Sequence, residues 1–266
     1  MCRQCGCNQT PSASTDTGST DPVRQTLHLQ AQVLAKNTQY ADHNRALFSH
    51  LLAVNVLSSP GAGKTTLLQQ LLKRDNLLSA VGIRPGVIVG DLATERDAER
   101  LHQAGIQARQ ITTGNLCHLE ASSVAKAAHQ LDLATLDFLV IENVGNLVCP
   151  AAYDLGEDLR IVVMSVTEGE DKPLKYPTTF KLAQVVVISK IDLAAAVEFD
   201  REETLRHLHQ IAPQAVVFEL SAKTGEGMRD LADYLRQAIA DQHNKVKTDS
   251  VSITSRAASP MISQRL

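Results

Sequence analysis

A glycine-rich segment with one lysine carries the strongest chemical signal in the chain. It consists of Ser58, Ser59, Pro60, Gly61, Ala62, Gly63, Lys64, Thr65 and Thr66. Glycines let backbone N–H groups curl around phosphate oxygens, a lysine adds charge at the β- and γ-phosphates, and a threonine hydroxyl binds Mg²⁺. The pattern predicts a phosphate-binding loop from Pro60 to Thr66 with Lys64 in catalysis, although Ser58 stands where the usual pattern has glycine. The alternative is a glycine-rich turn with a chance lysine.

Two later motifs indicate which base the nucleotide carries. The segment 185–193, VVVISKIDL, contains Lys190 and Asp192 and resembles the guanine-specificity motif N-K-x-D, with Ser189 in place of the usual Asn. A carboxylate there accepts two N–H bonds from guanine that adenine does not offer. The segment 219–227, ELSAKTGEG, resembles the loop that contacts the guanine O6, through Ser221, Ala222 and Lys223. Either motif alone fits a surface turn, but together they predict GTP and GDP.

Two carboxylates lie at the ends of predicted strands, close to the predicted phosphate-binding loop. Asp91 ends GVIVGD, and Glu142 opens Glu-Asn-Val-Gly, which is similar to the D-x-x-G of GTPases. Carboxylates at the carboxyl edge of a parallel sheet can hold Mg²⁺ and orient an attacking water. We expect Asp91 and Glu142 to act with Thr65 at Mg²⁺ and with Lys64 in catalysis, and Gly145 to donate its N–H to the γ-phosphate. The alternative is a helix cap or a solvated loop acid.

Thiols and one imidazole form a second set of candidate ligands. Cys117 and His118 are adjacent, and Cys149 follows Glu142 by seven residues. Cys149 should therefore lie on a segment that moves when the γ-phosphate is lost. Thiolate and imidazole suit Ni²⁺ or Zn²⁺, and a fourth ligand would come from water or from a second subunit. The alternative is a buried structural cysteine and a histidine at a helix start.

The elements that must position these residues follow an alternating pattern. Apolar runs at 53–58, 86–91, 138–143, 160–166, 184–190 and 215–221 predict strands, with helical stretches between most of them. Val/Ile-rich runs of this kind are buried on both faces, so the pattern predicts an α/β fold, a P-loop NTPase with a mainly parallel sheet flanked by helices. Asp21 is predicted to cap a helix that begins at Pro22. From there to about residue 50 the pattern fits either one long helix or two short helices. Residues 228–240 read as a last amphipathic helix.

The chain divides into three expected parts. Residues 1–21 hold Cys2, Cys5, Cys7 and a Ser/Thr-rich linker, residues 22–242 form the nucleotide-binding domain, and residues 243–266 read as a flexible tail. The net charge of −3 and the absence of a Lys/Arg block argue against nucleic-acid or membrane surfaces. The polar start and the lack of a spanning apolar run predict a cytoplasmic protein, where thiols stay reduced. An odd count of five cysteines also disfavours a disulfide framework.

Five segments together resemble the HypB family of hydrogenase nickel-incorporation GTPases. They are CRQCGC, SSPGAGKTTLL, GDLATERDAERL, TTGNLCHLEA and IENVGNLVCPA, and the resemblance covers residues 22–240 and the N-terminus. It implies slow GTP hydrolysis, a GTP-dependent homodimer, and nickel delivery to the [NiFe]-hydrogenase large subunit with the metallochaperone HypA. It also implies an N-terminal nickel motif at Cys2, Cys5 and Cys7, and a domain metal site at Cys117, His118 and Cys149.

Three other functions are weighed against this resemblance. A urease-type nickel GTPase has a Cys-Pro-His metal motif, whereas Cys117 and His118 are adjacent here. A metal-binding sensor or storage protein would bind GTP without releasing phosphate. A small-molecule kinase would need an acceptor site, and none is evident.

If the initiator Met is removed, the Cys2 amine and three thiolates could form a square-planar site that suits Ni²⁺.

Overall fold

A seven-stranded sheet forms the centre of the computed structural model, which describes residues 22–73, 77–91, 96–114 and 116–257. Within these residues the strand order is β3-β2-β4-β1-β5-β6-β7, and every neighbouring pair is parallel. The strands are β1 (Leu52–Ser58), β2 (Pro85–Asp91), β3 (Gln107–Thr112), β4 (Phe138–Gly145), β5 (Leu159–Ser165), β6 (Val185–Ser189) and β7 (Val216–Leu220). The predicted α/β class and its parallel sheet are confirmed.

The sequence missed one strand, β3. The six predicted strands are all present, and each observed boundary differs from the prediction by no more than two residues. In β3 the sequence Gln-Ala-Arg-Gln-Ile-Thr is mostly polar, and only Ala108 is fully buried. This strand lies at the edge of the sheet and pairs with β2 alone. An edge strand needs fewer apolar side chains, so it lacks the Val/Ile run that marked the others.

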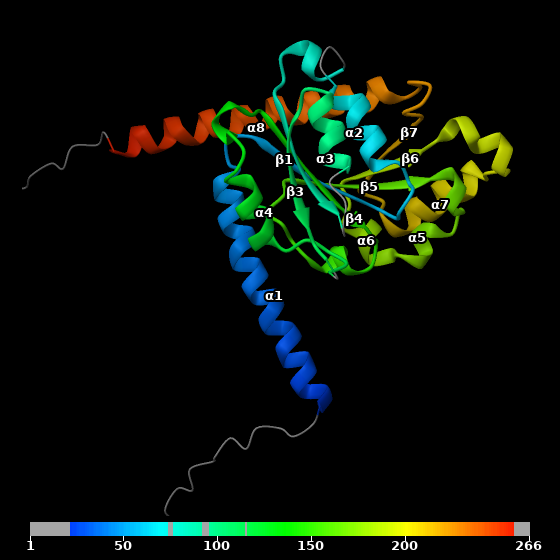
Figure 1. The fold of residues 1–266 in the computed structure, drawn as a ribbon, viewed down its shortest axis with the longest axis horizontal. Helices are drawn as coiled ribbons and strands as arrows, with labels where there is room; N and C mark the ends of the chain where they lie inside the picture. The colour runs from blue at the N-terminus through cyan, green and yellow to red at the C-terminus, as the bar shows by residue number, and fades with distance from the viewer. Residues whose placement is uncertain (1–21, 74–76, 92–95, 115, 258–266) are drawn as a thin grey trace, which may run out of the picture.

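Helices cover both faces of this sheet, as Figure 1 shows. They are α1 (Pro22–Leu47), α2 (Lys64–Leu72), α3 (Arg96–Gln103), α4 (Ala121–Ala128), α5 (Lys172–Lys175), α6 (Pro177–Lys181), α7 (Arg201–Ile211) and α8 (Met228–Ala257). The 3₁₀ turns are η1 (Ser79–Val81), η2 (Leu133–Thr135), η3 (Cys149–Ala152), η4 (Val166–Glu168) and η5 (Ile191–Val197). Helices α2, α3 and α8 share one apolar cluster with alternate strand residues such as Val54. The other alternate residues, such as Leu139 and Val162, pack with α4 or with α6 and α7.

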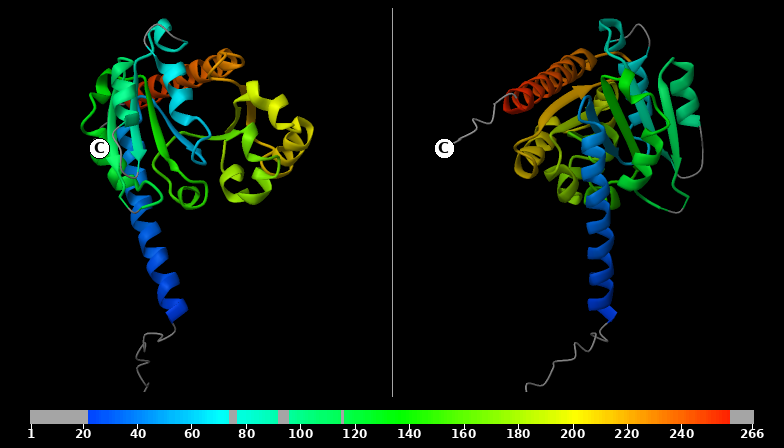
Figure 2. Two further views of the ribbon diagram at one scale, coloured as in Figure 1. Left: turned by 45° about the vertical axis from the view of Figure 1, so that its right-hand side comes forward. Right: turned by 90° about the vertical axis from the view of Figure 1, so that its left-hand side faces the viewer.

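The two terminal helices extend beyond this layered body. Helix α1 begins at Pro22 and is continuous to Leu47, so the single-helix alternative is the observed one. It packs on α4 near its C-terminal end, and its N-terminal part projects away from the sheet (Figure 2). No helix within the described ranges is long and apolar enough to cross a membrane.

The prediction of a loose tail from residue 243 is wrong for residues 243–257. These residues continue α8, which runs from Met228 to Ala257 instead of ending near residue 240. The stretch is polar and has no apolar period, but it also lacks glycine and proline. A helix that is already nucleated on the sheet can propagate through such residues at little cost.

Candidate functional site

The loop between β1 and α2 is shaped by glycines in the left-handed region. Gly61 has φ of 77° and Gly63 has φ of 95°, and Gly63 immediately precedes the first residue of α2. A side chain is strained at such angles, so the loop needs glycine at both positions. The result is a backbone turn at a helix N-terminus, where N–H groups and the helix dipole favour a phosphate.

Lys64 is held in place by the residue that departs from the usual loop pattern. Its side chain is 9% exposed, and its Nζ donates to Ser58 Oγ at 2.7 Å. Ser58 is fully buried, and its hydroxyl donates in turn to the Ser59 carbonyl at 2.6 Å. The serine in place of glycine therefore supplies an acceptor for the loop lysine.

Oxygen donors meet at the carboxyl ends of β1, β2 and β4. The Thr65 hydroxyl donates to Glu142 Oε1 at 2.6 Å, and Glu142 is 3% exposed. Asp91, at the end of β2, lines the same cavity of about 510 Å³ as Lys64 and both of these residues. A hydroxyl and two carboxylates suit Mg²⁺, which prefers oxygen ligands and retains several waters. The residues present therefore fit the ion that the sequence predicts.

Gly145 closes one side of this cavity. A Cβ placed on Gly145 would lie 3.1 Å from the Cα of Pro60 in the phosphate loop. That contact is tighter than carbon atoms normally make, so a larger residue would push the two segments apart. Gly145 thus keeps the end of β4 in contact with the loop, where its N–H could reach a phosphate.

A smaller cavity of about 210 Å³ adjoins the first and contains the predicted base-binding residues. Lys190, Asp192, Ser221, Ala222 and Lys223 line it, and Gly63, Thr66 and Lys190 are shared with the larger cavity. Both cavities lie where the parallel strands end, which is the usual ligand position in such sheets. The structure thus brings the predicted phosphate-binding and base-binding residues to one continuous groove.

Two side chains at the C-terminal end of β6 are bonded to the phosphate loop. Ser189 donates its hydroxyl to the Ala62 carbonyl at 2.8 Å, and it is 4% exposed. Lys190 has φ of 59° and donates its Nζ to the Gly61 carbonyl at 2.7 Å. Serine in place of the usual asparagine therefore still makes a bond to the loop.

Asp192 is oriented by the loop that follows β7. Its Oδ1 accepts a hydrogen bond from Ser221 Oγ at 2.6 Å, and its Oδ2 lies 3.9 Å from Lys223 Nζ. Ser221 Oγ also accepts the backbone N–H groups of Lys223 and Thr224, each at 3.2 Å. One buried hydroxyl therefore fixes both the turn and the carboxylate that lines the base cavity.

The structure also brings the second predicted set together. Cys149 is the neighbour that, by side-chain hydrogen bonding and ahead of burial, raises the pKa of Cys117. Cys117 Sγ lies 3.9 Å from Nδ1 of His118, and Asn146 donates to the Cys117 carbonyl at 3.1 Å. We call Cys117, His118 and Cys149 the thiol–imidazole cluster.

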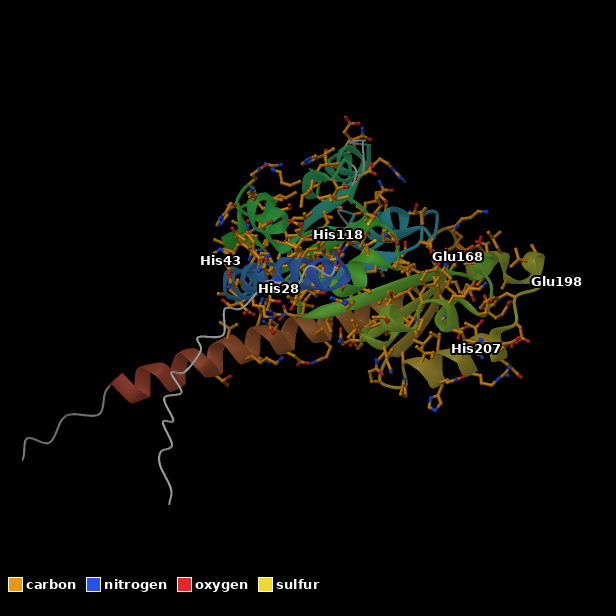
Figure 3. The ribbon with its side chains drawn as sticks, turned by 90° about the horizontal axis from the view of Figure 1, so that it is seen from below. His28, His43, His118, Glu168, Glu198 and His207 are labelled. Atoms are coloured by element: carbon orange, nitrogen blue, oxygen red, sulfur yellow. The ribbon has the colours of Figure 1, made fainter. Side chains whose placement is uncertain are left out.

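His118 is held as a half-buried ring. It stacks on Tyr153 with 3.8 Å between ring centroids, and Figure 3 shows it apart from His207 on the α7 side. Burial lowers the pKa of His118, and the negative charge of Glu120 opposes this less strongly. Its Nε2 is buried and has no hydrogen-bond partner among the described residues. A neutral imidazole with an uncommitted nitrogen is the form that binds metal ions.

The cluster is not a formed metal centre in this conformation. Across the residues that the structure describes, no three His, Cys, Asp or Glu side chains are grouped so that they could hold a metal ion. His118 Nδ1 lies 3.9 Å from Cys117 Sγ, and the same ring stacks on Tyr153. Cys2, Cys5 and Cys7 lie outside the described residues, as does the whole predicted linker to residue 21.

Several residues of the site were not found from the sequence. Arg100, in α3, and Asn143, in β4, line the larger cavity, and Tyr153 stacks on His118. Arg100 sits in a strongly charged helix, where nothing distinguishes it from a solvated side chain. Tyr153 is four residues after Cys149, and no motif marks it.

The sheet order, the glycine-shaped loop after β1 and the adjoining base cavity define a P-loop nucleotide-binding protein. The chain belongs to the CobW/HypB/UreG family, because the model of that family's nucleotide-binding domain matches residues 52–219. The resemblance noted in its motifs is thereby confirmed.

Individual relatives are similar over most of the chain. It is 44% identical over 216 residues to the "Hydrogenase maturation factor HypB" of Escherichia coli (strain K12), covering 80% of this chain and 72% of the relative. It is 42% identical over 210 residues to the "Hydrogenase/urease maturation factor HypB" of Helicobacter pylori (strain ATCC 700392 / 26695). This match covers 77% of this chain and 84% of the relative. A crystal structure of HypB from Helicobacter pylori in complex with nickel matches with a TM-score of 0.73 and 40% identity. The match covers 78% of this chain and 97% of that one.

Proposed function

We propose that this protein is a GTP-hydrolysing nickel metallochaperone that assists nickel insertion into [NiFe]-hydrogenase. The main observation behind this proposal is that one short segment of the chain joins the nucleotide cavity to the thiol–imidazole cluster. Glu142 and Gly145 line the nucleotide cavity, and the same chain reaches Cys149 a few residues later, the residue that most raises the pKa of Cys117. The maturation factors and the nickel complex among its relatives support the same assignment.

Lys64, Asp91 and Glu142 carry hydrolysis in this proposal. The Lys64 ammonium, freed from Ser58, stabilises the charge on the β- and γ-phosphates. Thr65, Asp91 and Glu142 would hold Mg²⁺, which neutralises charge that develops on the phosphate oxygens. The Asp91 and Glu142 carboxylates also orient the attacking water, and Gly145 donates its N–H to the γ-phosphate.

The guanine base occupies the smaller cavity. Asp192 accepts two guanine N–H bonds while Ser221 fixes its carboxylate, and the backbone at Ala222 and Lys223 contacts the base. Pro60, Gly61, Ala62, Gly63 and Thr66 surround the phosphates. GTP and GDP are therefore the proposed ligands.

Nickel is the cargo and binds at two places. The thiol–imidazole cluster supplies two thiolates and one imidazole, whose Nδ1 already lies 3.9 Å from Cys117 Sγ, and it would also accept Zn²⁺. Cys2, Cys5 and Cys7 form the second place. The proposed partners are a second copy of the chain in the GTP state, HypA and the [NiFe]-hydrogenase large subunit, all in the cytoplasm.

A urease-linked role is the second candidate. One relative, from Helicobacter pylori, is named a hydrogenase/urease maturation factor, so the same scaffold occurs in a protein with both designations. A nucleotide-regulated sensor or storage protein is the remaining alternative.

Phosphate release from the full-length protein tests the proposal. With GTP and Mg²⁺, slow release of phosphate is expected, and Cys149→Ala should remove nickel bound at the thiol–imidazole cluster. Binding of GTP with no phosphate release at all would contradict the proposal and favour a sensor.

A further inference from the structure

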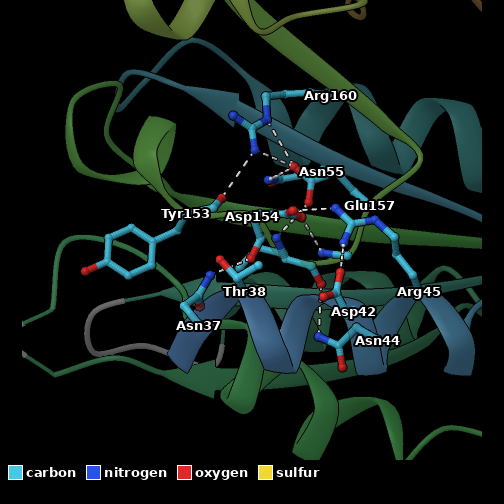
Figure 4. A network of polar contacts seen from close by, with 12 residues as sticks. Asn37, Thr38, Asp42, Asn44, Arg45, Asn55, Tyr153, Asp154, Glu157 and Arg160 are labelled. Carbon is cyan, nitrogen blue, oxygen red and sulfur yellow. Dashed lines mark hydrogen bonds and ion pairs between the residues drawn. The ribbon is translucent and has the colours of Figure 1, made fainter. Parts of the chain in front are cut away.

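A buried ion pair lies behind the segment that carries Cys149. Arg160, in β5, is 8% exposed, and its Nη2 lies 2.6 Å from Glu157 Oε1, to which its Nε also donates at 3.0 Å. Both side chains lie in a low-dielectric interior, where a pair persists only if its remaining groups are also bonded. Figure 4 shows the pair together with Asn55 and Tyr153.

The remaining donors of Arg160 hold the backbone between Cys149 and the sheet. Its Nη1 donates to the Ala151 carbonyl at 3.1 Å, and its Nη2 donates to the Tyr153 carbonyl at 3.3 Å. Ala151 belongs to η3, which begins at Cys149. Tyr153 is the residue whose ring stacks on His118. The guanidinium thereby fixes the backbone that positions both a thiol and the imidazole of the thiol–imidazole cluster.

The other end of the ion pair leads to the nucleotide cavity. Asn55, fully buried in β1, donates its Nδ2 to Glu157 Oε1 at 3.1 Å. Its Oδ1 accepts from Asn143 Nδ2 at 3.3 Å, and Asn143 lines the nucleotide cavity. Asn143 Oδ1 in turn accepts the Val144 N–H at 3.0 Å, next to Gly145. A movement of the Gly145 segment toward a phosphate therefore pulls on Asn143 and on the chain of bonds behind it.

We propose that Asn55, Glu157 and Arg160 are positioning residues that tie the nucleotide cavity to the thiol–imidazole cluster, so that the bound nucleotide sets nickel affinity there. This inference rests on the proposed nickel function of that cluster. In this proposal the shared element is the segment 145–149, which the nucleotide biases at Gly145 and the metal biases at Cys149. Coupling of this kind is reciprocal and typically amounts to about 5- to 150-fold in affinity.

A second set of bonds on the same segment offers a matched control. Asn37, in α1, donates to the Asp154 carbonyl at 2.7 Å and accepts the Ala121 N–H at 2.9 Å. It is 7% exposed and so comparably buried, but none of these bonds leads toward the nucleotide cavity. Loss of Asn37 should loosen the cluster without breaking its link to the nucleotide.

The experiment measures the nickel dissociation constant of the full-length chain carrying Cys2→Ser, Cys5→Ser and Cys7→Ser. Each protein is titrated with GDP and with a non-hydrolysable GTP analogue, both with Mg²⁺. In this background the two constants should differ at least about fivefold. Asn55→Leu, which keeps the branching of the side chain and removes its hydrogen bonds, should bring the ratio within about twofold of one. Asn37→Ala should keep the original ratio, even if both constants shift.

The outcomes separate this inference from the function on which it rests. A lower melting temperature for Asn55→Leu with an unchanged ratio would show that the relay is only structural, and so would overturn the inference. A ratio of one in the background protein would also overturn it while leaving the nickel site in place. Unchanged nickel binding after Cys149→Ala would instead refute the proposed site itself. If Asn55→Leu is unfolded by circular dichroism, Asn55→Ala replaces it in the same comparison.

Discussion

Replacing Asp192 with asparagine probes base recognition at a single atom. Ser221 Oγ donates to Asp192 Oδ1 at 2.6 Å, and an amide oxygen in that position would still accept this bond. The amide nitrogen then takes the place of Oδ2, which lies 3.9 Å from Lys223 Nζ. The loop should keep its shape because its serine remains bonded, so the substitution changes only what the cavity offers to the base.

The expected loss follows from two charge-assisted hydrogen bonds. Each contributes about 1.5–3 kcal/mol, so Asp192→Asn should weaken GTP binding by about 3 kcal/mol or more, which is about 100-fold or more. Xanthosine nucleotides, which carry a carbonyl where guanine has its amino group, should bind better to the variant than to the wild type. The assay is competition of GTP and xanthosine triphosphate against a fluorescent nucleotide.

Asp171→Asn is the matched control, because that carboxylate is exposed and pairs with Lys175 outside both cavities. It should leave GTP affinity unchanged. If Asp192→Asn binds GTP as tightly as the wild-type protein does, guanine recognition by this carboxylate is refuted.

Three further predictions concern the phosphate loop and the thiols. Lys64→Ala should abolish GTP hydrolysis with an unchanged circular dichroism spectrum. The control Lys73→Ala, just beyond α2, should hydrolyse GTP as the wild type does. Retained turnover in Lys64→Ala would exclude the loop from catalysis. Ser58→Ala removes an acceptor of the buried Lys64 ammonium, so thermal unfolding should show a loss of about 1 kcal/mol, and an unchanged melting temperature would contradict this. The hydrogen bond with Cys149 raises the pKa of Cys117, so this thiol stays protonated at pH 7 and nickel must displace its proton. Nickel affinity of the cluster should therefore rise from pH 7 to pH 9, by up to about tenfold per unit for each proton released, in calorimetric titrations; affinity independent of pH would show that this thiol is not a ligand.

The fold was predictable where local sequence decides it. The Val/Ile run of β6 and the glycines of the phosphate loop each have one good structural solution, because buried strands need apolar side chains and positive φ needs glycine. The edge strand β3 and the C-terminal half of α8 have neither signal. Their structure depends on what they extend, a sheet edge or an existing helix, and not on their own composition.

The site was predictable by residue type but not by pairing. The chemistry of Thr65, Glu142 and Asp192 follows from motifs, and the structure places these residues in α2, β4 and η5, where they line the two adjoining cavities. The bond between Asn55 and Glu157 joins residues 102 apart in sequence, and no local pattern encodes such a contact. Ser58 and Ser189 are further examples, since both depart from the usual motif and yet bond to functional backbone or side-chain groups.

Nickel bound per chain is the most direct test of the central claim, that one P-loop protein holds nickel at two separate places. It should be measured for the wild type, for a deletion of residues 1–7 and for Cys149→Ala. The account predicts that the deletion removes one class of nickel and leaves GTP hydrolysis nearly unchanged. It predicts that Cys149→Ala removes the other class and alters how nickel affects the GTPase rate. Equal nickel stoichiometry in all three proteins would contradict the account.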